Sequence, residues 1–233
     1  MLPVPEHVAI IMDGNRRWAK QRSCSPWEGH KKGEEVVEEV LEKALGMNIK
    51  HTTFWTLSLD NVEKRSEEEV EYLMDLFVEN FKRIKEEERI HENEVKINVL
   101  GRWKQILPER VTEAIEEAVE ATKDYSNYYL NLLIAYSGKD EMLRAIRRIT
   151  EDSPDKGDIT SELIKKNLFT SELPPVDLMI RTGGEPHNST GFMMWDTANS
   201  QYYFSEKLWP EFSSEDFEEA VEDYRKRERR FGE

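Results

Sequence analysis

Charged residues and a glycine lie together near the start of the chain in the segment MDGNRRWAK, residues 12–20. Asp13, Gly14 and Asn15 predict a tight turn that presents backbone N–H groups at the start of a helix, where an anion binds. Arg16 and Arg17 add guanidinium groups, which bind phosphate oxygens in bidentate fashion. The Asp13 carboxylate is a hard oxygen ligand that suits Mg²⁺ bridging to a diphosphate. The same residues are equally consistent with a structural turn, a helix cap and two surface arginines.

The segment RTGGE, residues 181–185, is a second candidate for binding an anion. Its two glycines let the backbone approach a ligand closely, and Arg181 stands at the end of a predicted strand. A Gly-Gly turn alone favours a purely structural role. Two turns that each combine arginine with glycine, at one edge of a sheet, are stronger evidence together.

Several familiar motifs are absent from the sequence. It contains no GxxxxGK[ST] phosphate loop, GxGxxG fingerprint, HExxH, CxxC or Asp-Asp-x-x-Asp cluster. The five histidines lack the spacing of zinc ligands, and His30 within EGHKKG is the one most worth following. The acidic runs EEVVEE and EEEVEY are interpreted as solvated helix faces.

Strands and helices that would position these residues alternate along the chain. Apolar and β-branched runs predict strands at 7–12, 51–59, 95–101, 128–138 and 175–184. Apolar residues at helical spacing, with start signals at Ser66 and Pro108, predict helices near 36–45, 66–85, 108–119, 140–149, 159–168 and 215–231. Residues 153–157 are predicted to form a loop, and residues 192–204 a buried strand or a short helix.

This alternation predicts an α/β fold, in which a central, mostly parallel sheet is flanked by helices. Ligands of such sheets bind beyond the carboxyl ends of the strands. MDGN, SLDN, YSGKD and RTGGE each follow a predicted strand, so we expect them along one rim. We expect residues 1–233 to form a single catalytic domain.

Composition narrows the class of protein. The 233 residues include 38% hydrophobic side chains, six Trp and nine Phe, which is enough for a packed core. The net charge of −15 argues against a general nucleic-acid partner. The single cysteine, Cys24, fits a reducing cytoplasm. Residues 1–15 lack a basic leader and a long apolar run, so we expect a cytoplasmic protein with at most peripheral membrane contact.

Together these segments resemble the cis-prenyltransferase family of the undecaprenyl diphosphate synthase type. The resemblance covers nearly the whole chain, through HVAIIMDGNRRWAK, EGHKKG, SLDNVEKRSEEEV, LNLLIAYSGKDEM, PPVDLMIRTGGE, YYFSEKLWPEF and RERRFG. It implies a deep apolar substrate tunnel and a homodimer. It also implies Mg²⁺-dependent condensation of an allylic prenyl diphosphate with isopentenyl diphosphate, a C5 diphosphate acceptor, to give a Z-configured polyprenyl diphosphate.

The resemblance also implies roles for individual residues. Asp13 would bind the metal and act in catalysis. Asn61 would accept a proton or, because an amide is a weak base, position groups while the departing diphosphate takes it. Arg181 would bind the acceptor diphosphate. The other residues implied to bind substrate are Gly14, Asn15, Arg16, Arg17, Trp18, His30, Ser58, Leu59, Asp60, Arg65, His187 and Ser189.

The chemistry of such a reaction agrees with these residue types. Ionising an allylic C–O bond places negative charge on the leaving diphosphate, which arginines, helix N–H groups and Mg²⁺ stabilise. The growing chain requires a dry apolar cavity. Aromatic and leucine residues of strand 51–59 and of helix 66–85 could line one, although the same pattern fits an ordinary core.

Four positions depart from the family pattern. Pro26 and His187 stand where arginines are expected, Gln201 stands in place of a metal-binding glutamate, and Val62 in place of an aromatic residue. Losing a positive charge opposite a diphosphate weakens its binding. An altered-acceptor prenyltransferase is therefore one alternative, using dimethylallyl diphosphate in a non-head-to-tail condensation or an alcohol. A non-catalytic prenyl-binding partner subunit is a second.

Overall fold

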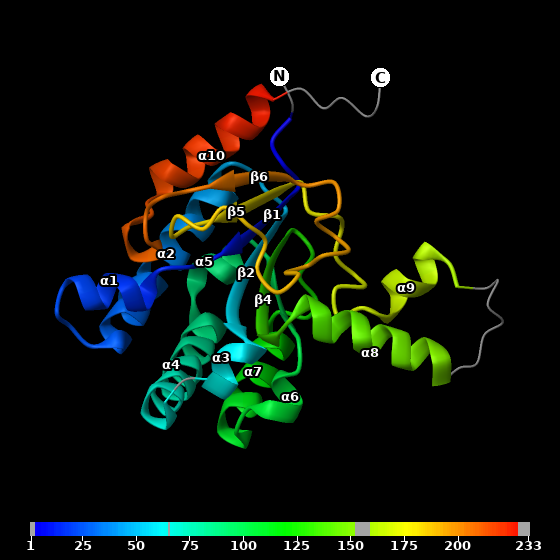
Figure 1. Cartoon of the computed structure of the whole chain (residues 1–233), viewed down its shortest axis with the longest axis horizontal. Coiled ribbons are helices and arrows are strands. Elements are labelled where there is room, and N and C mark those ends of the chain that lie inside the picture. The colour runs from blue at the N-terminus through cyan, green and yellow to red at the C-terminus, as the bar shows by residue number, and fades with distance from the viewer. Residues whose placement is uncertain (1–2, 65, 152–158, 228–233) are drawn as a thin grey trace.

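The computed structural model describes residues 3–64, 66–151 and 159–227. Six strands form one sheet in the order β3-β4-β2-β1-β5-β6, and every neighbouring pair is parallel (Figure 1). The sheet is thus entirely parallel, where the sequence predicted a mostly parallel one. Its strands are β1 (His7–Ile11), β2 (His51–Ser58), β3 (Val95–Leu100), β4 (Tyr128–Tyr136), β5 (Leu178–Arg181) and β6 (Gln201–Phe204).

Helices connect the strands. They are α1 (Asn15–Gln21), α2 (Pro26–Gly46), α3 (Leu59–Lys64), α4 (Glu67–Glu86), α5 (Glu88–Glu92), α6 (Trp103–Ile106), α7 (Glu109–Ala121), α8 (Gly138–Glu151), α9 (Ser161–Asn167) and α10 (Ser214–Lys226), with a 3₁₀ turn, η2 (Trp209–Glu211). Start signals read from the sequence act as expected, because the Ser66 hydroxyl accepts a hydrogen bond from the Glu69 N–H and caps α4. Pro108 is the N-cap residue of α7.

Both faces of the sheet are covered. Alternate residues of a strand point to opposite faces, so neighbouring residues of β1 belong to different apolar clusters. Val8 and Ile10 of β1 belong to one apolar cluster, which includes residues of α2, α4, α7 and α10. Ala9 and Ile11 belong to a second cluster with Phe192 on the other face. Figure 1 shows α8 and α9 lying away from α1, α2 and α4.

The expected strands agree with the structure apart from two corrections, whereas the short helices α3, α5 and α6 were not predicted. The strand predicted at 175–184 is limited to Leu178–Arg181, because the glycines after it have positive φ and turn the chain. Only Gln201–Phe204 of the 192–204 segment forms a strand, and the residues before it form turns. The loop at 153–157, Arg65 and the tail beyond residue 227 lie outside the described residues.

The four motifs expected along one rim do share an edge. MDGN, SLDN, YSGKD and RTGGE follow or overlap the carboxyl ends of β1, β2, β4 and β5, and parallel strands bring these ends to the same side. In the part of the chain that the structure describes, no helix is both long and apolar enough to cross a membrane.

Candidate active site

Asp13 lies between two arginines at the carboxyl end of the sheet. Its Oδ1 is 3.0 Å from Nη2 of Arg17, and its Oδ2 accepts a hydrogen bond of 3.0 Å from Nη2 of Arg181. The Arg181 side chain is only 6% exposed, whereas that of Arg17 is 44% exposed. A buried guanidinium requires an anionic or hydrogen-bonding partner, and the carboxylate supplies one. The two arginine-containing segments identified in the sequence therefore form a single site.

The backbone around this site is fixed by Thr182. Its Oγ1 accepts a hydrogen bond from the Asp13 N–H at 3.0 Å and donates one to the Asp13 carbonyl at 2.8 Å. Gly183 has φ +90°, a conformation that side chains disfavour, and its carbonyl accepts from Arg17 Nη1 at 2.8 Å. The RTGG turn thus aligns both the carboxylate and an arginine.

The EGHKKG motif brings α1 and α2 together. A Cβ at Gly33 would lie 2.3 Å from Asn15 Oδ1, so only glycine allows this approach. The Gly33 carbonyl accepts a hydrogen bond of 2.7 Å from the Trp209 indole N–H. Asn15 Oδ1 is buried and has no hydrogen-bond partner among the described residues. Trp18, also predicted to bind substrate, packs beneath the Arg22 guanidinium at 4.4 Å.

His30 is held by a carboxylate from α4. Its Nε2 lies 3.3 Å from Glu69 Oε1, and both side chains are largely buried. Arg16 Nε lies 3.8 Å from the other oxygen of Glu69. Glu69 therefore links two of the predicted substrate-binding residues.

The SLDN segment joins the end of β2 to the start of α3. The Ser58 Oγ accepts a hydrogen bond of 3.1 Å from the Asn61 N–H, and Leu59 and Asp60 begin α3. Ser58 and Asn61 are thus joined by a local hydrogen bond at the start of α3. Arg65, the next predicted residue along the chain, is outside the described residues.

The side chains expected to bind the acceptor, those of His187 and Ser189, make other contacts than those of Asp13, Arg17 and Arg181. The His187 carbonyl, rather than its ring, accepts a hydrogen bond of 2.7 Å from Arg181 Nη1. The His187 ring is 57% exposed and lies 3.7 Å from Glu185. The Ser189 hydroxyl lies 3.5 Å from that of Thr190.

The other departures from the family pattern have local explanations. Gln201 pairs with Leu178 at the start of β6, whereas Arg181 pairs with Phe204 at its end. Within one chain, Gln201 is therefore three residues of strand away from the level of Arg181. Pro26 opens α2 beside the capping Ser25. Val62 packs against the core.

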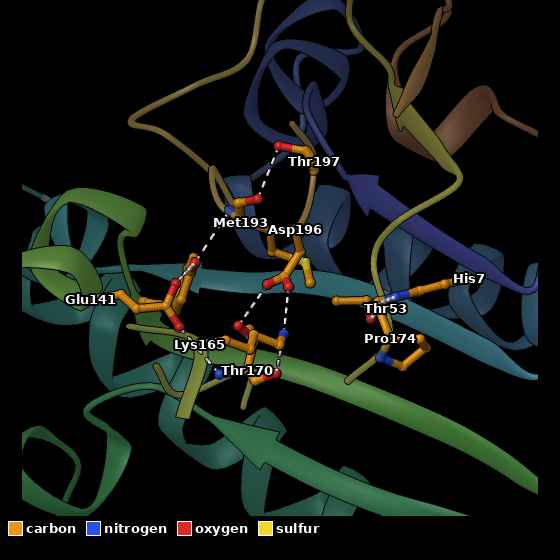
Figure 2. Close-up of polar contacts among 10 residues, drawn as sticks. His7, Thr53, Glu141, Lys165, Thr170, Pro174, Met193, Asp196 and Thr197 are labelled. Carbon is orange, nitrogen blue, oxygen red and sulfur yellow. Dashed lines mark hydrogen bonds and ion pairs between the residues drawn. The ribbon is translucent and has the colours of Figure 1, made fainter. Parts of the chain in front are cut away.

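A buried polar network holds the turns at Met193 and Asp196, which follow His187 in the chain (Figure 2). The Tyr136 hydroxyl donates to Glu141 at 2.6 Å and accepts from the Met193 N–H at 3.2 Å. Glu141 also accepts from the Thr170 N–H at 3.2 Å, and the Thr170 hydroxyl donates to Asp196 at 2.6 Å. Burial raises the pKa of both carboxyl groups, Glu141 and Asp196. The network fixes the turns that precede β6.

A cavity of about 410 Å³ lies between α2, α4 and the sheet. Asn15 and His30 line it beside the Asp13 group, and Gly46 and Asn93 line it at the opposite end of α2. Because residues 30 to 46 of α2 border it, the cavity follows this helix for about 24 Å. Its apolar lining includes Val37, Leu41, Phe54, Leu73, Leu76, Phe77, Phe81, Leu130 and Leu132.

Three features of this site were not predicted from the sequence. Thr182 directly follows Arg181 in the RTGGE segment, and this position is the only signal in the sequence for the role of its hydroxyl. Glu69 was predicted only as part of a helix cap, and nothing in its spacing indicates contact with His30. The sequence also did not show which aromatic residue of strand 51–59 faces the cavity: Phe54 lines it, whereas Trp55 stacks on Phe192 at the other face of the sheet.

Comparison with known proteins places the chain in a family. The family model described as putative undecaprenyl diphosphate synthase matches residues 11–232. A tritrans,polycis-undecaprenyl-diphosphate synthase (geranylgeranyl-diphosphate specific) of Thermococcus kodakarensis is 45% identical, over 98% of this chain and 87% of its own length. The chain therefore belongs to the undecaprenyl diphosphate synthase family of cis-prenyltransferases, as its motifs predicted.

Solved structures agree with this assignment. The crystal structure of lavandulyl diphosphate synthase from Lavandula x intermedia, in complex with dimethylallyl diphosphate, is 32% identical with a TM-score of 0.91 and 99% coverage of both chains. That of a probable undecaprenyl diphosphate synthase from Campylobacter jejuni is 27% identical with a TM-score of 0.80 and complete coverage of both. The protein is a prenyltransferase that condenses an allylic diphosphate with isopentenyl diphosphate.

Proposed function

We propose that this protein elongates geranylgeranyl diphosphate with isopentenyl diphosphate in the presence of Mg²⁺, giving a Z-configured polyprenyl diphosphate. The observation that carries the proposal is the Asp13 carboxylate held between Arg17 and Arg181 beside a long apolar cavity. Charged groups suited to a diphosphate thus adjoin a space suited to its hydrocarbon chain. The donor is inferred from the name of the Thermococcus relative.

In this proposal the donor diphosphate binds at the start of α1. Arg17 is partly exposed and already oriented by the Gly183 carbonyl, so it can bind phosphate oxygens without reorganising. Arg16 and His30 add donors around Glu69. Gly14, Asn15 and Trp18 complete the segment, and the prenyl chain enters the cavity past Asn15.

A magnesium ion fits the residues present. Mg²⁺ is usually bound through one or two carboxylates together with substrate phosphates and waters, so the single Asp13 carboxylate is sufficient as the protein ligand. The described residues contain no group of three or more His, Cys, Asp or Glu that could hold a metal ion by itself. When bound, the ion would neutralise charge that develops on the leaving diphosphate.

The bond changes follow from the two substrates. The allylic C–O bond breaks and the diphosphate leaves with the electron pair. The double bond of isopentenyl diphosphate attacks the allylic carbon to form a C–C bond, and loss of a proton creates the new Z double bond. Arg17 stabilises the departing charge, while Asn61 positions groups and the departing diphosphate takes the proton.

The acceptor diphosphate is assigned to Arg181. His187 supports this arginine through its backbone carbonyl, so the ring need not replace a missing arginine there. Ser189 lies close by in the chain, and Ser58, Leu59 and Asp60 are proposed to border the acceptor from the β2 side. A role for Arg65 stays a prediction from the sequence. The names of the relatives favour this regular elongation over an altered acceptor or a non-catalytic subunit.

We further propose a homodimer in which α8 contributes to the interface. Leu143 and Ile146 are three residues apart on this helix and are 54% and 51% exposed, so they form an apolar stripe on its surface. Sedimentation of the wild-type protein and a Leu143→Asp, Ile146→Asp variant tests this proposal, with a monomeric variant expected. A cytoplasmic location and peripheral membrane contact stay predictions from the sequence.

The activity is tested by mass spectrometry of products formed from geranylgeranyl diphosphate and Mg²⁺. Isopentenyl diphosphate should give a ladder spaced by one isoprene unit, and Asp13→Ala should give none. Dimethylallyl diphosphate is offered in parallel as the acceptor. A single-addition product from it, without a ladder from isopentenyl diphosphate, would replace regular elongation by the altered-acceptor alternative.

A further inference from the structure

A row of ion pairs joins α2 to α4 and α5 along one side of the cavity. Glu34, Glu38 and Glu42 are spaced four residues apart, so they lie in one line on α2. Arg83 of α4 contacts the carboxylates of both Glu34 and Glu38. Arg89 of α5 lies 3.2 Å from Glu42. We call these five residues the Glu–Arg seam.

All five seam residues line the cavity. The opposite wall, formed by the sheet, is made of buried apolar side chains such as Phe54. By contrast, the Arg83 and Arg89 side chains are each 49% exposed. Burial beside the cavity raises the pKa of Glu34, so its contact with Arg83 crosses a partly desolvated region. The seam is thus a polar, solvent-reaching side of a cavity whose sheet side is mainly apolar.

The cavity is small for the product of the proposed reaction. A cavity of about 150 Å³ holds one benzene molecule, or roughly 25 Å³ per carbon. A volume of about 410 Å³ therefore holds on the order of 16 carbons. A geranylgeranyl chain already fills this space, and an undecaprenyl chain has roughly three times as many carbons as it holds. A longer chain therefore needs a wider cavity or a path out of it.

We propose that the Glu–Arg seam is the wall that opens for the growing chain, and that Arg83 and Arg89 thereby determine product length. The proposal rests on the proposed function. Opening the sheet side would separate the buried apolar core, whereas ion pairs made by half-exposed arginines are weak. A closed seam stops the chain at the size of the cavity, and an open seam lets it pass between α2 and α4.

The test compares product ladders from wild type, Arg83→Gln and Arg110→Gln under identical conditions. Arg110 is the matched control, because it also contacts two carboxylates across helices, those of Glu71 and Asp75, and is 38% exposed. Arg110, Glu71 and Asp75 do not line the cavity. Arg83→Gln should raise the ratio of long to short products about twofold to fivefold, which is the range that the strength of an exposed ion pair allows. Arg110→Gln should leave the ratio unchanged.

Ionic strength provides a second test that needs no variant. Raising salt from about 0.1 M to about 1 M shortens the Debye length from about 10 Å to about 3 Å and weakens exposed pairs. The wild-type ladder should shift toward longer products, and the Arg83→Gln ladder should shift less. The seam proposal would be overturned if Arg83→Gln gave the same product ladder as wild type, or if salt shifted the ladders of all three proteins equally. Either result would leave the proposed function intact. A wild type that forms no ladder overturns the proposed function and the seam proposal with it.

Discussion

The Asp13 carboxylate accepts a hydrogen bond of 3.0 Å from Arg181, a residue 168 positions later in the chain. Asp13 follows β1 and Arg181 ends β5, and these two strands pair directly. The parallel sheet therefore places a carboxylate and a buried guanidinium side by side, although neither segment predicts the other. Removing the carboxylate tests what this pairing does.

Asp13→Ala is expected to reduce turnover strongly without weakening donor binding. Loss of the carboxylate proposed to hold Mg²⁺, and with it the stabilisation of the developing charge, lowers kcat by about 10²–10³-fold. The two arginines lose their internal anionic partner, so geranylgeranyl diphosphate should bind as tightly as before, or more tightly, in a metal-free buffer. Steady-state kinetics and calorimetric titration measure the two effects. Weaker binding together with normal kcat would contradict the assignment, and Asp13→Asn separates the effect of charge from that of shape.

Gly183→Ala is expected to impair both stability and activity. The residue has φ +90°, and an added Cβ would lie 2.4 Å from Arg17 Nη2. The strained backbone costs about 1–3 kcal/mol of unfolding free energy, and the displaced arginine should raise the KM for the donor. Urea unfolding and kinetics measure both.

Gly46→Ala is the control for that substitution. No atom lies within 4 Å of the Cβ that it would add at the end of α2. Alanine there should leave the stability unchanged or raise it by up to about 1 kcal/mol. Equal destabilisation by the two substitutions would mean that the conformation of Gly183 is unimportant.

The sequence predicted the rim and its arginine turns because strand ends and glycine turns are local signals. Long-range pairing is not local, and this explains why the contact between Glu69 and His30 was missed. The short helix α3 was missed because LDNVEK offers too few apolar residues for a helical pattern. The turns before β6 include Met193 at φ +44°. Methionine rarely adopts this conformation, so the sequence does not predict it.

His7 is expected to make stability depend on pH below neutrality. Its buried ring contacts the Pro174 carbonyl at 2.9 Å and the Thr53 hydroxyl at 2.7 Å (Figure 2). Burial lowers the pKa of His7 from 6.5 to about 4. Above pH 6.5 the ring is neutral in both the folded and the unfolded state. As the pH falls from 6.5 toward 4, the unfolded state takes up the proton first, so stability falls by about 2 kcal/mol between pH 6.5 and 5.

A His7→Gln variant isolates this contribution, because other titrating groups are common to both proteins. Unfolding by urea at pH 7 and pH 5 should show a smaller loss of stability in the variant by about that same 2 kcal/mol. His51, whose pKa burial also lowers to about 4, remains in both proteins. Identical pH slopes would show that His7 is not held neutral.

Tyr136→Phe is expected to loosen the acceptor side of the site. The lost hydroxyl donates to Glu141 at 2.6 Å and accepts from the Met193 N–H at 3.2 Å, and all three groups are buried. Leaving buried polar groups unpaired costs about 1–3 kcal/mol of stability. The turn that follows His187 should also become less ordered, and Arg181 depends on the His187 carbonyl. The KM for isopentenyl diphosphate should therefore rise while the KM for the donor stays the same.

Tyr202→Phe serves as the control for the loss of a tyrosine hydroxyl. Among the described residues its hydroxyl makes only a long contact of 3.5 Å with the Thr197 carbonyl, so stability and both KM values should change little. If Tyr136→Phe raised both KM values equally, the network would act on the whole domain. A selective rise for the acceptor would instead connect the buried Glu141 carboxylate, through Tyr136 and the turn at Met193, with the orientation of Arg181.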